Sequence, residues 1–173
     1  IVPFYDRIEL VTAAIHTVRD ALIEGVVLVT VVFFLFLGHV RSAIVVTVSL
    51  FVTPLITFLV MQRAGLSANL MTLGGLAIGI GEIADGSLVV VENIYRHLSE
   101  NRLQQRSRLE VIFQATNEVG RPILFGILII SVVFLPLMTL HGMEGKMFAP
   151  LAYTLVISLL ASVIVTLTLS PVL

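Results

Sequence analysis

The chain has 173 residues, of which 58% are hydrophobic and 12% are charged, and its mean hydropathy is +1.09. An average soluble domain carries about 25% charged residues, so this composition excludes an ordinary soluble domain and indicates an integral membrane protein. The net charge of −1 argues against nucleic-acid binding, and the absence of cysteine excludes disulfides and thiolate metal sites.

Charged residues gather in two stretches, with six from Asp6 to Glu24 and eight from Arg96 to Arg121. Residues 1–21 predict an amphipathic helix that leads into the membrane from the extracytoplasmic side. The chain begins with Ile1 rather than Met and carries no secretory signal pattern, so we expect an internal piece of a longer protein.

The rest of the sequence forms apolar runs of about the length that crosses a bilayer. They cover residues 22–37, 43–61, 70–95, 122–140 and 147–173. None alternates with the period of a membrane β-strand, so we expect an all-α membrane protein with three transmembrane helices in 22–95 and two in 122–173. Residues 96–121 between them predict a cytoplasmic linker, which is either an amphipathic helix on the membrane surface or a solvated segment.

Positive charges indicate the orientation of these helices. Arg41 and the five arginines of residues 96–121 fall on one side of the membrane, whereas Arg63 and Lys146 fall on the other. The side with more positive charge is cytoplasmic by the positive-inside rule.

The third run, residues 70–95, contains three acidic residues: Glu82, Asp85 and Glu92. At about 100° per residue, Asp85 and Glu92 lie about 20° apart around the helix axis, and Glu82 lies about 60° from Asp85. Charged groups at this depth normally face protein or water rather than lipid, so we expect this face to point into a helix bundle.

Asp85 is the most central of the three and is the candidate proton carrier, because desolvation raises a carboxyl pKa and a nearby cation lowers it again. A purely structural hydrogen bond is the alternative. For Glu92, helix-end capping or a surface ion pair with Arg96 competes with a proton-relay role, and Glu82 stays open for the same reason. No Lys or Arg lies inside the five runs, so we expect the partner cation elsewhere.

Glycines accompany the acidic residues, and Gly75, Gly79 and Gly86 are the candidates for close helix packing. The spacing Gly75-x-x-x-Gly79 allows another helix to approach closely. We expect a glycine-lined acidic face that awaits a second bundle of helices, although ordinary tight packing would explain the glycines without any function.

Several motifs resemble those of the resistance-nodulation-division efflux pumps, and among these the heavy-metal efflux branch. Residues 84–93, ADGSLVVVEN, resemble the signature of the family's fourth transmembrane helix, in which Glu-Asn follows an Asp by seven residues. Residues 3–7 resemble the motif before its second transmembrane helix, residues 38–42 the following cytoplasmic turn, and residues 144–152 the connection between its fifth and sixth helices.

The resemblance implies that the five runs are helices two to six of a twelve-helix protomer. It also implies a multi-pass protein of the bacterial inner membrane, without a cofactor, that exchanges protons for a metal cation. Such pumps form homotrimers in membrane lipid and join a periplasmic adaptor and an outer-membrane channel. In them, the Asp matching Asp85 takes part in proton relay with a Lys from the second half of the protomer.

Departures from the family patterns leave the metal open. The multidrug branch carries a second Asp at the place of Ala84, which favours the metal branch here. Some zinc, cobalt and cadmium pumps carry an Asp at the place of Gly79. Met71 matches a methionine of copper and silver pumps and is a candidate metal ligand, because thioether sulfur suits Cu(I), although core packing is the alternative. Ile83 and Val90 occupy places where those pumps carry further methionines.

Three other functions compete with metal export. One is a multidrug-type exporter of the same family, and another is a non-pumping membrane module built on a similar bundle. An intramembrane aspartyl protease is disfavoured, because Asp6 lies outside every apolar run and a Glu stands at the second acid position. His16, His39, His97 and His141 show no helical pairing, so a zinc site built by this chain alone is not expected.

Overall fold

The computed structural model describes residues 7–36, 40–100 and 107–172. The described residues form five α-helices and no strand: α1 (Arg7–Phe36), α2 (Val40–Arg63), α3 (Leu70–Glu100), α4 (Arg108–Met138) and α5 (Gly142–Leu169). The expected all-α membrane fold is therefore confirmed. Asp6 and most of the motif at residues 3–7 lie outside the described residues, and so do residues 38 and 39 of the motif at 38–42.

Four of these helices, α2, α3, α4 and α5, are long and apolar enough to cross a membrane. Helix α1 does not reach this standard within the described residues, although its apolar run was expected to span. The physical reason is that Arg19, Asp20 and Glu24 interrupt the apolar part of the helix. The uncharged segment between Glu24 and Phe36 is shorter than a membrane-spanning helix needs. The multi-pass character of the chain rests on the other four.

The two amphipathic segments are parts of longer helices rather than separate elements. The lead-in residues from Arg7 onward and the first apolar run form one helix, α1, with no break near Ala21. Residues 96–100 continue α3, and residues 108–121 begin α4. Backbone hydrogen bonding continues through the predicted boundaries near Ala21 and Arg96, where no Pro interrupts the sequence, and α4 continues through Pro122 at the third boundary.

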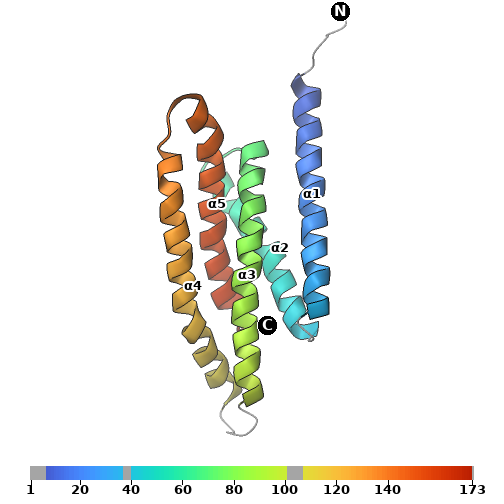
Figure 1. Ribbon diagram of the computed structural model, residues 1–173, viewed down its shortest axis with the longest axis vertical. Coiled ribbons are helices and arrows are strands. Elements are labelled where there is room, and N and C mark those ends of the chain that lie inside the picture. The colour runs from blue at the N-terminus through green and yellow to red at the C-terminus, as the bar shows by residue number, and fades with distance from the viewer. Residues whose placement is uncertain (1–6, 37–39, 101–106, 173) are drawn as a thin grey trace, which may run out of the picture.

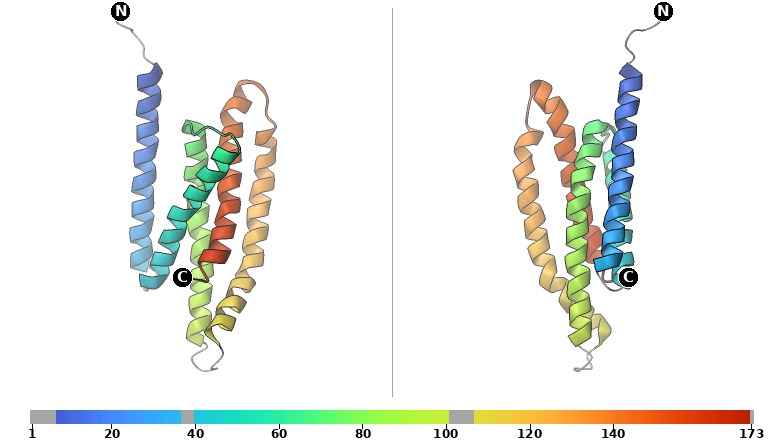
Figure 2. Two further views of the ribbon diagram at one scale, coloured as in Figure 1. Left: turned by 180° about the vertical axis from the view of Figure 1, so that it is seen from behind. Right: turned by 45° about the vertical axis from the view of Figure 1, so that its right-hand side comes forward.

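Helix α3 occupies the centre of the arrangement and contacts each of the other four helices (Figure 1). Helices α4 and α5 lie beside it on one side, and α2 crosses behind it (Figures 1 and 2). Helix α1 meets α2 and α3 only toward its C-terminal end, where Phe33 and Val29 join an apolar cluster with Val46 and Ile83. The N-terminal half of α1 stands away from the other helices (Figure 2).

Prolines lie inside three of the described helices, α2, α4 and α5, and each removes one backbone N–H donor from its helix. Pro54 lies in α2, where the hydroxyl of Thr57 donates to the Thr53 carbonyl at 2.9 Å. In α5 the Thr154 hydroxyl donates to the Pro150 carbonyl at 2.9 Å. Such hydroxyl-to-backbone bonds satisfy side-chain donors where no water is present.

Candidate functional site

The first turn of α3 is fixed by Asn69. Its side-chain Oδ1 accepts hydrogen bonds from the backbone N–H groups of Met71 at 2.9 Å and Thr72 at 3.0 Å. The Thr72 hydroxyl accepts one in return from the Asn69 backbone N–H at 2.7 Å. These bonds satisfy amide groups that a helix start leaves free. The candidate metal ligand Met71 is half-buried in this turn.

Two of the three predicted packing glycines lie against α5. A Cβ added at Gly75 would stand 2.4 Å from the Leu151 carbonyl oxygen, and one at Gly79 would stand 2.2 Å from the Ser158 Oγ. At Gly86 a Cβ would meet nothing within 4 Å in the described residues. The first half of α3 therefore approaches α5 more closely than any larger residue would permit, and Gly86 plays no part in that contact.

A buried hydrogen bond extends the contact between α3 and α5. The hydroxyl groups of Ser87 and Thr166 lie 3.0 Å apart, and both side chains are almost completely buried. Ser87 lies about two helical turns beyond the close approach at Gly79. Helix α3 is thus held to α5 through small side chains along much of its length.

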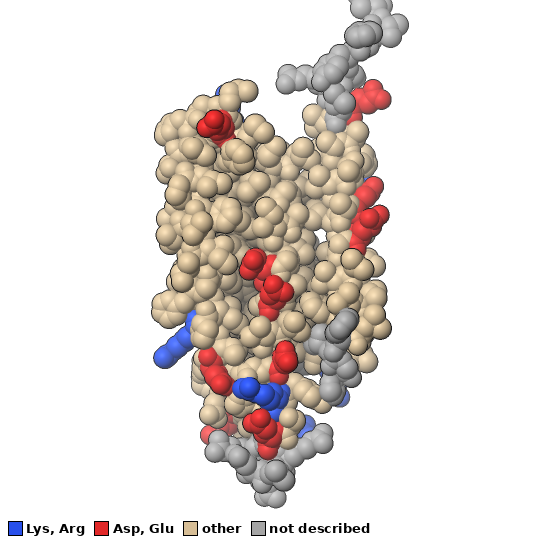
Figure 3. All heavy atoms as spheres, viewed as in Figure 1, with Lys and Arg blue, Asp and Glu red and all other residues tan. Residues whose placement is uncertain are grey.

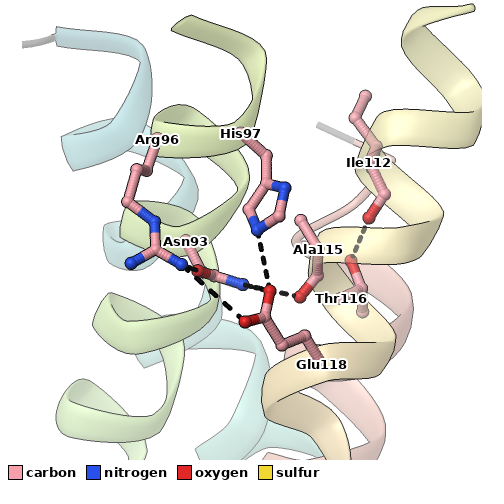
Figure 4. Close-up of polar contacts among 7 residues, drawn as sticks. All are labelled: Asn93, Arg96, His97, Ile112, Ala115, Thr116 and Glu118. Atoms are coloured by element: carbon pink, nitrogen blue, oxygen red, sulfur yellow. Dashed lines mark hydrogen bonds and ion pairs between the residues drawn. The ribbon is translucent and has the colours of Figure 1, made fainter. Parts of the chain in front are cut away.

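A polar cluster joins the last turns of α3 to the first turns of α4 (Figure 4). The buried Asn93 amide donates to the Ala115 carbonyl at 2.8 Å and to Glu118 Oε2 at 3.3 Å. Arg96 donates to Asn93 Oδ1 at 2.8 Å and lies 3.8 Å from Glu118 Oε1. His97 Nε2 lies 2.7 Å from Glu118 Oε2.

This cluster was missed by the sequence reasoning. Glu-Asn at residues 92–93 belongs to the predicted motif, and helical geometry places the two side chains about 100° apart, but the sequence does not indicate which helix Asn93 faces. Asn93 is buried and binds α4, whereas Glu92 is exposed. The signal in the sequence is the pair Asn93 and His97, which are four residues apart and therefore on one side of the helix. Two polar side chains on one side can indicate a contact to another helix, because a buried Asn must find hydrogen-bond partners.

The three acidic residues of α3 lie on a face that the chain's own helices leave uncovered. Glu82, Asp85 and Glu92 are all exposed, together with the uncharged residues Ala77, Ile78, Gly81 and Val89 of the same helix. We call this surface the acidic face. Figure 3 shows acidic side chains surrounded by uncharged surface partway along the molecule.

No residue in the described part of the chain forms an ion pair with Glu82, Asp85 or Glu92. The alternative of a surface ion pair between Glu92 and Arg96 is not formed, since Arg96 binds Asn93 and Glu118 instead. The carboxylates are therefore available to a cation outside this chain segment. Figure 3 shows that Lys and Arg gather mainly toward the lower end of the molecule, where acidic side chains also lie.

Within the described residues, no group of three or more His, Cys, Asp or Glu side chains is arranged to hold a metal ion. His97 contacts Glu118 between two helices, whereas His16, inside α1, and His141, just before α5, are exposed. The acidic face presents single carboxylates along one helix rather than a cluster of metal ligands among the described residues.

Three apolar helices pack around a fourth, α3, which carries the acidic face, and comparison with known proteins identifies the class of this membrane helix bundle. The family model described as AcrB/AcrD/AcrF matches residues 1–173. The chain belongs to this family, the resistance-nodulation-division transporters, which are secondary transporters and not enzymes.

Several relatives are metal resistance or cation efflux proteins by name. The chain is 46% identical to Protein HelA of Legionella pneumophila over 96% of its length, and 45% identical to the cobalt-zinc-cadmium resistance protein CzcA of Cupriavidus metallidurans over 99%. A crystal structure of a heavy metal efflux pump superimposes with a TM-score of 0.81 at 39% identity, covering 98% of this chain. The chain spans 16% of the length of each of these proteins.

Proposed function

We propose that this chain forms part of the proton-relay region of a pump that drives heavy-metal cations out across the bacterial inner membrane. The acidic face carries this proposal. Three carboxylates lie along one side of an otherwise apolar helix, without a cation from this chain, while the rest of that helix is held by α4 and α5. An ionisable group in such a helix has a high free-energy cost when it faces lipid. We therefore expect the acidic face to meet protein or water in the complete pump and to serve its function.

Asp85 is the proposed proton carrier, since it lies near the middle of α3. In an apolar setting the protonated form is favoured, and a facing cation restores the charged form. We place that cation, a lysine, in the remainder of the protomer. Protonation of Asp85 removes its attraction to the lysine, and the helices on the two sides can then adopt a different packing, which changes access to the transport path.

Glu92 and Glu82 flank Asp85 on the acidic face and are proposed to extend the proton path toward the two ends of α3. Gly81 and Gly86, which have open space in this chain, would let a facing helix of the same protomer approach the carboxylates. Met71, in the first turn of α3, stays a candidate ligand for a soft metal cation. The metal itself is the transported substrate rather than a resident cofactor.

The proposed assembly is a homotrimer embedded in membrane lipid. Its partners are the remainder of the pump protomer, a periplasmic adaptor and an outer-membrane channel, together with protons and the metal cation. The names of several relatives, such as cation efflux system protein CusA of Escherichia coli at 39% identity, support export of metal cations.

A multidrug-type exporter of the same family is the second candidate, and Ala84 argues against it. Ala84 is buried in an apolar cluster with Val46, Leu50 and Ile83. The second Asp that the multidrug branch carries at this place would be buried among hydrocarbon side chains without a partner. A non-pumping module of similar fold would not need the carboxylates to titrate.

The test is Asp85→Asn in the full-length pump that contains this chain. Asparagine keeps the size of the side chain but cannot exchange a proton, so we expect loss of metal resistance with normal expression and trimer assembly. The matched control is Glu110→Gln, which neutralises an exposed carboxylate in the first turn of α4, away from the acidic face. Metal-dependent proton flux in proteoliposomes should fail with Asp85→Asn and persist with Glu110→Gln. Full resistance with Asp85→Asn would overturn the proposal.

A further inference from the structure

A second feature of the bundle is an open cavity at the end where α3 finishes and α4 begins. Its volume is about 540 Å³, and the start of α2, the last turns of α3, the start of α4 and the end of α5 contribute to it. The lining residues are Val40, Arg41, Ser42, Val45, Val91, Ile94, Tyr95, Leu98, Arg108, Ile112, Ser170 and Pro171. We call it the basal cavity. It lies apart from the acidic face, which contributes none of its lining.

Two arginines and no acidic residue line the basal cavity. Within the described residues, neither Arg41 nor Arg108 forms an ion pair with a carboxylate. The nearby Glu118 is occupied, because it binds Asn93, His97 and Arg96. The cavity therefore carries uncompensated positive charge and is complementary to an anion.

The remaining lining is mainly apolar. Seven of the twelve residues are Val, Leu, Ile or Pro, contributed by all four helices. The hydroxyl oxygen of Ser170, a further lining residue that is only 6% exposed, has no hydrogen-bond partner in the described part of the chain. A small hydrated anion gains nothing from apolar walls, whereas a ligand with both a charged group and a hydrocarbon chain matches both kinds of lining.

We propose that the basal cavity binds an anionic phospholipid, with the phosphate between Arg41 and Arg108 and the first part of an acyl chain along the apolar wall. Two further points support a lipid. The cavity lies at the end of the helices that the charge distribution assigns to the cytoplasmic leaflet, and basic pockets between transmembrane helices on that side suit anionic headgroups. The site is independent of the proton relay, because no acidic residue of α3 takes part in it.

The experiment uses the full-length pump purified in a neutral detergent and titrated with phosphatidylglycerol, with bound lipid counted by native mass spectrometry. The double variant Arg41→Gln/Arg108→Gln should bind about fivefold less tightly for each charge lost. The control Arg63→Gln/Lys146→Gln removes the same charge from the exposed residues of the opposite end. We expect this control to bind as the wild type does.

A second variant separates the apolar wall from the charges. Leu98→Trp fills the cavity with a larger side chain and keeps both arginines, and it should also lower phosphatidylglycerol binding in a pump that still elutes as an assembled trimer. Phosphatidylcholine with the same acyl chains should bind more weakly than phosphatidylglycerol, and millimolar inorganic phosphate should not displace the lipid.

Three results would overturn the proposal. Equal binding by the arginine double variant and its control would mean that another segment of the pump or nothing occupies the cavity. Displacement of the lipid by inorganic phosphate would make it a site for soluble anions. Unchanged binding by an assembled Leu98→Trp pump would place the lipid elsewhere. Because the readout is lipid binding, none of these results depends on whether Asp85 carries protons.

Discussion

Replacing Gly75 by alanine tests the close approach of α3 to α5. The added Cβ would lie 2.4 Å from the Leu151 carbonyl oxygen, and ordinary van der Waals contact begins at 3.4 Å. Because that oxygen belongs to the α5 backbone, no side-chain rotation relieves the clash, and the helices must separate by about 1 Å at this point. Overpacking of this kind reduces the free energy of unfolding by about 1–3 kcal/mol.

The assay is thermal unfolding of the detergent-solubilised pump, followed by size-exclusion chromatography. Gly126→Ala is the matched control, because a Cβ at Gly126 meets nothing within 4 Å in the described residues and the change in backbone entropy is the same. We expect Gly75→Ala to melt below the wild type and Gly126→Ala to melt at or above it. Gly79→Ala should fall between them, since its Cβ meets the Ser158 hydroxyl, which can rotate. Equal melting temperatures for Gly75→Ala and Gly126→Ala would refute the close helix contact.

Three further predictions concern α3. Asn93→Ala removes the side-chain hydrogen bonds to the Ala115 carbonyl and to Glu118 of α4, so the free energy of unfolding should fall by about 1–3 kcal/mol relative to the exposed control Asn117→Ala; no difference would contradict the cluster. Ser87→Ala should destabilise the wild type more than a Thr166→Val background, and additivity in this double-mutant cycle would exclude the hydrogen bond. In a pump that exports Cu(I), Met71→Leu should lower copper resistance while zinc resistance is unchanged, and equal copper resistance would assign Met71 to packing.

The helices themselves could be predicted from hydropathy, because long apolar runs without alternation have few structures open to them in a membrane. The helix ends could not. The change from charged to apolar residues predicts a boundary near Ala21, and the change from apolar to charged residues predicts another at Arg96. Helices α1 and α3 nevertheless continue through these boundaries. Charge marks where a helix leaves the bilayer, whereas its end depends on backbone hydrogen bonding, which continues into the aqueous phase.

The shared face of Glu82, Asp85 and Glu92 followed from helical geometry, and the structure places all three on one exposed side of α3. The role of each glycine could not be assigned in the same way. Gly75 and Gly79 contact α5 within this chain, whereas Gly86 has open space, and all three look alike in sequence. Contacts between residues far apart in the chain, such as Asn93 with Glu118, depend on how helices pair and leave no local pattern.

The contacts that hold α3 to its neighbours extend from Gly75 to Asn93, a distance of about 27 Å along the helix axis at 1.5 Å per residue. The contacts are made first to α5 and then to α4. No two successive contacts along this length are more than about two helical turns apart. Such a helix cannot slide or rotate against its two neighbours without breaking several buried contacts together. Motion during a transport cycle should therefore carry α3, α4 and α5 as a single rigid body, and the displacement should be concentrated at the surface that bears the carboxylates.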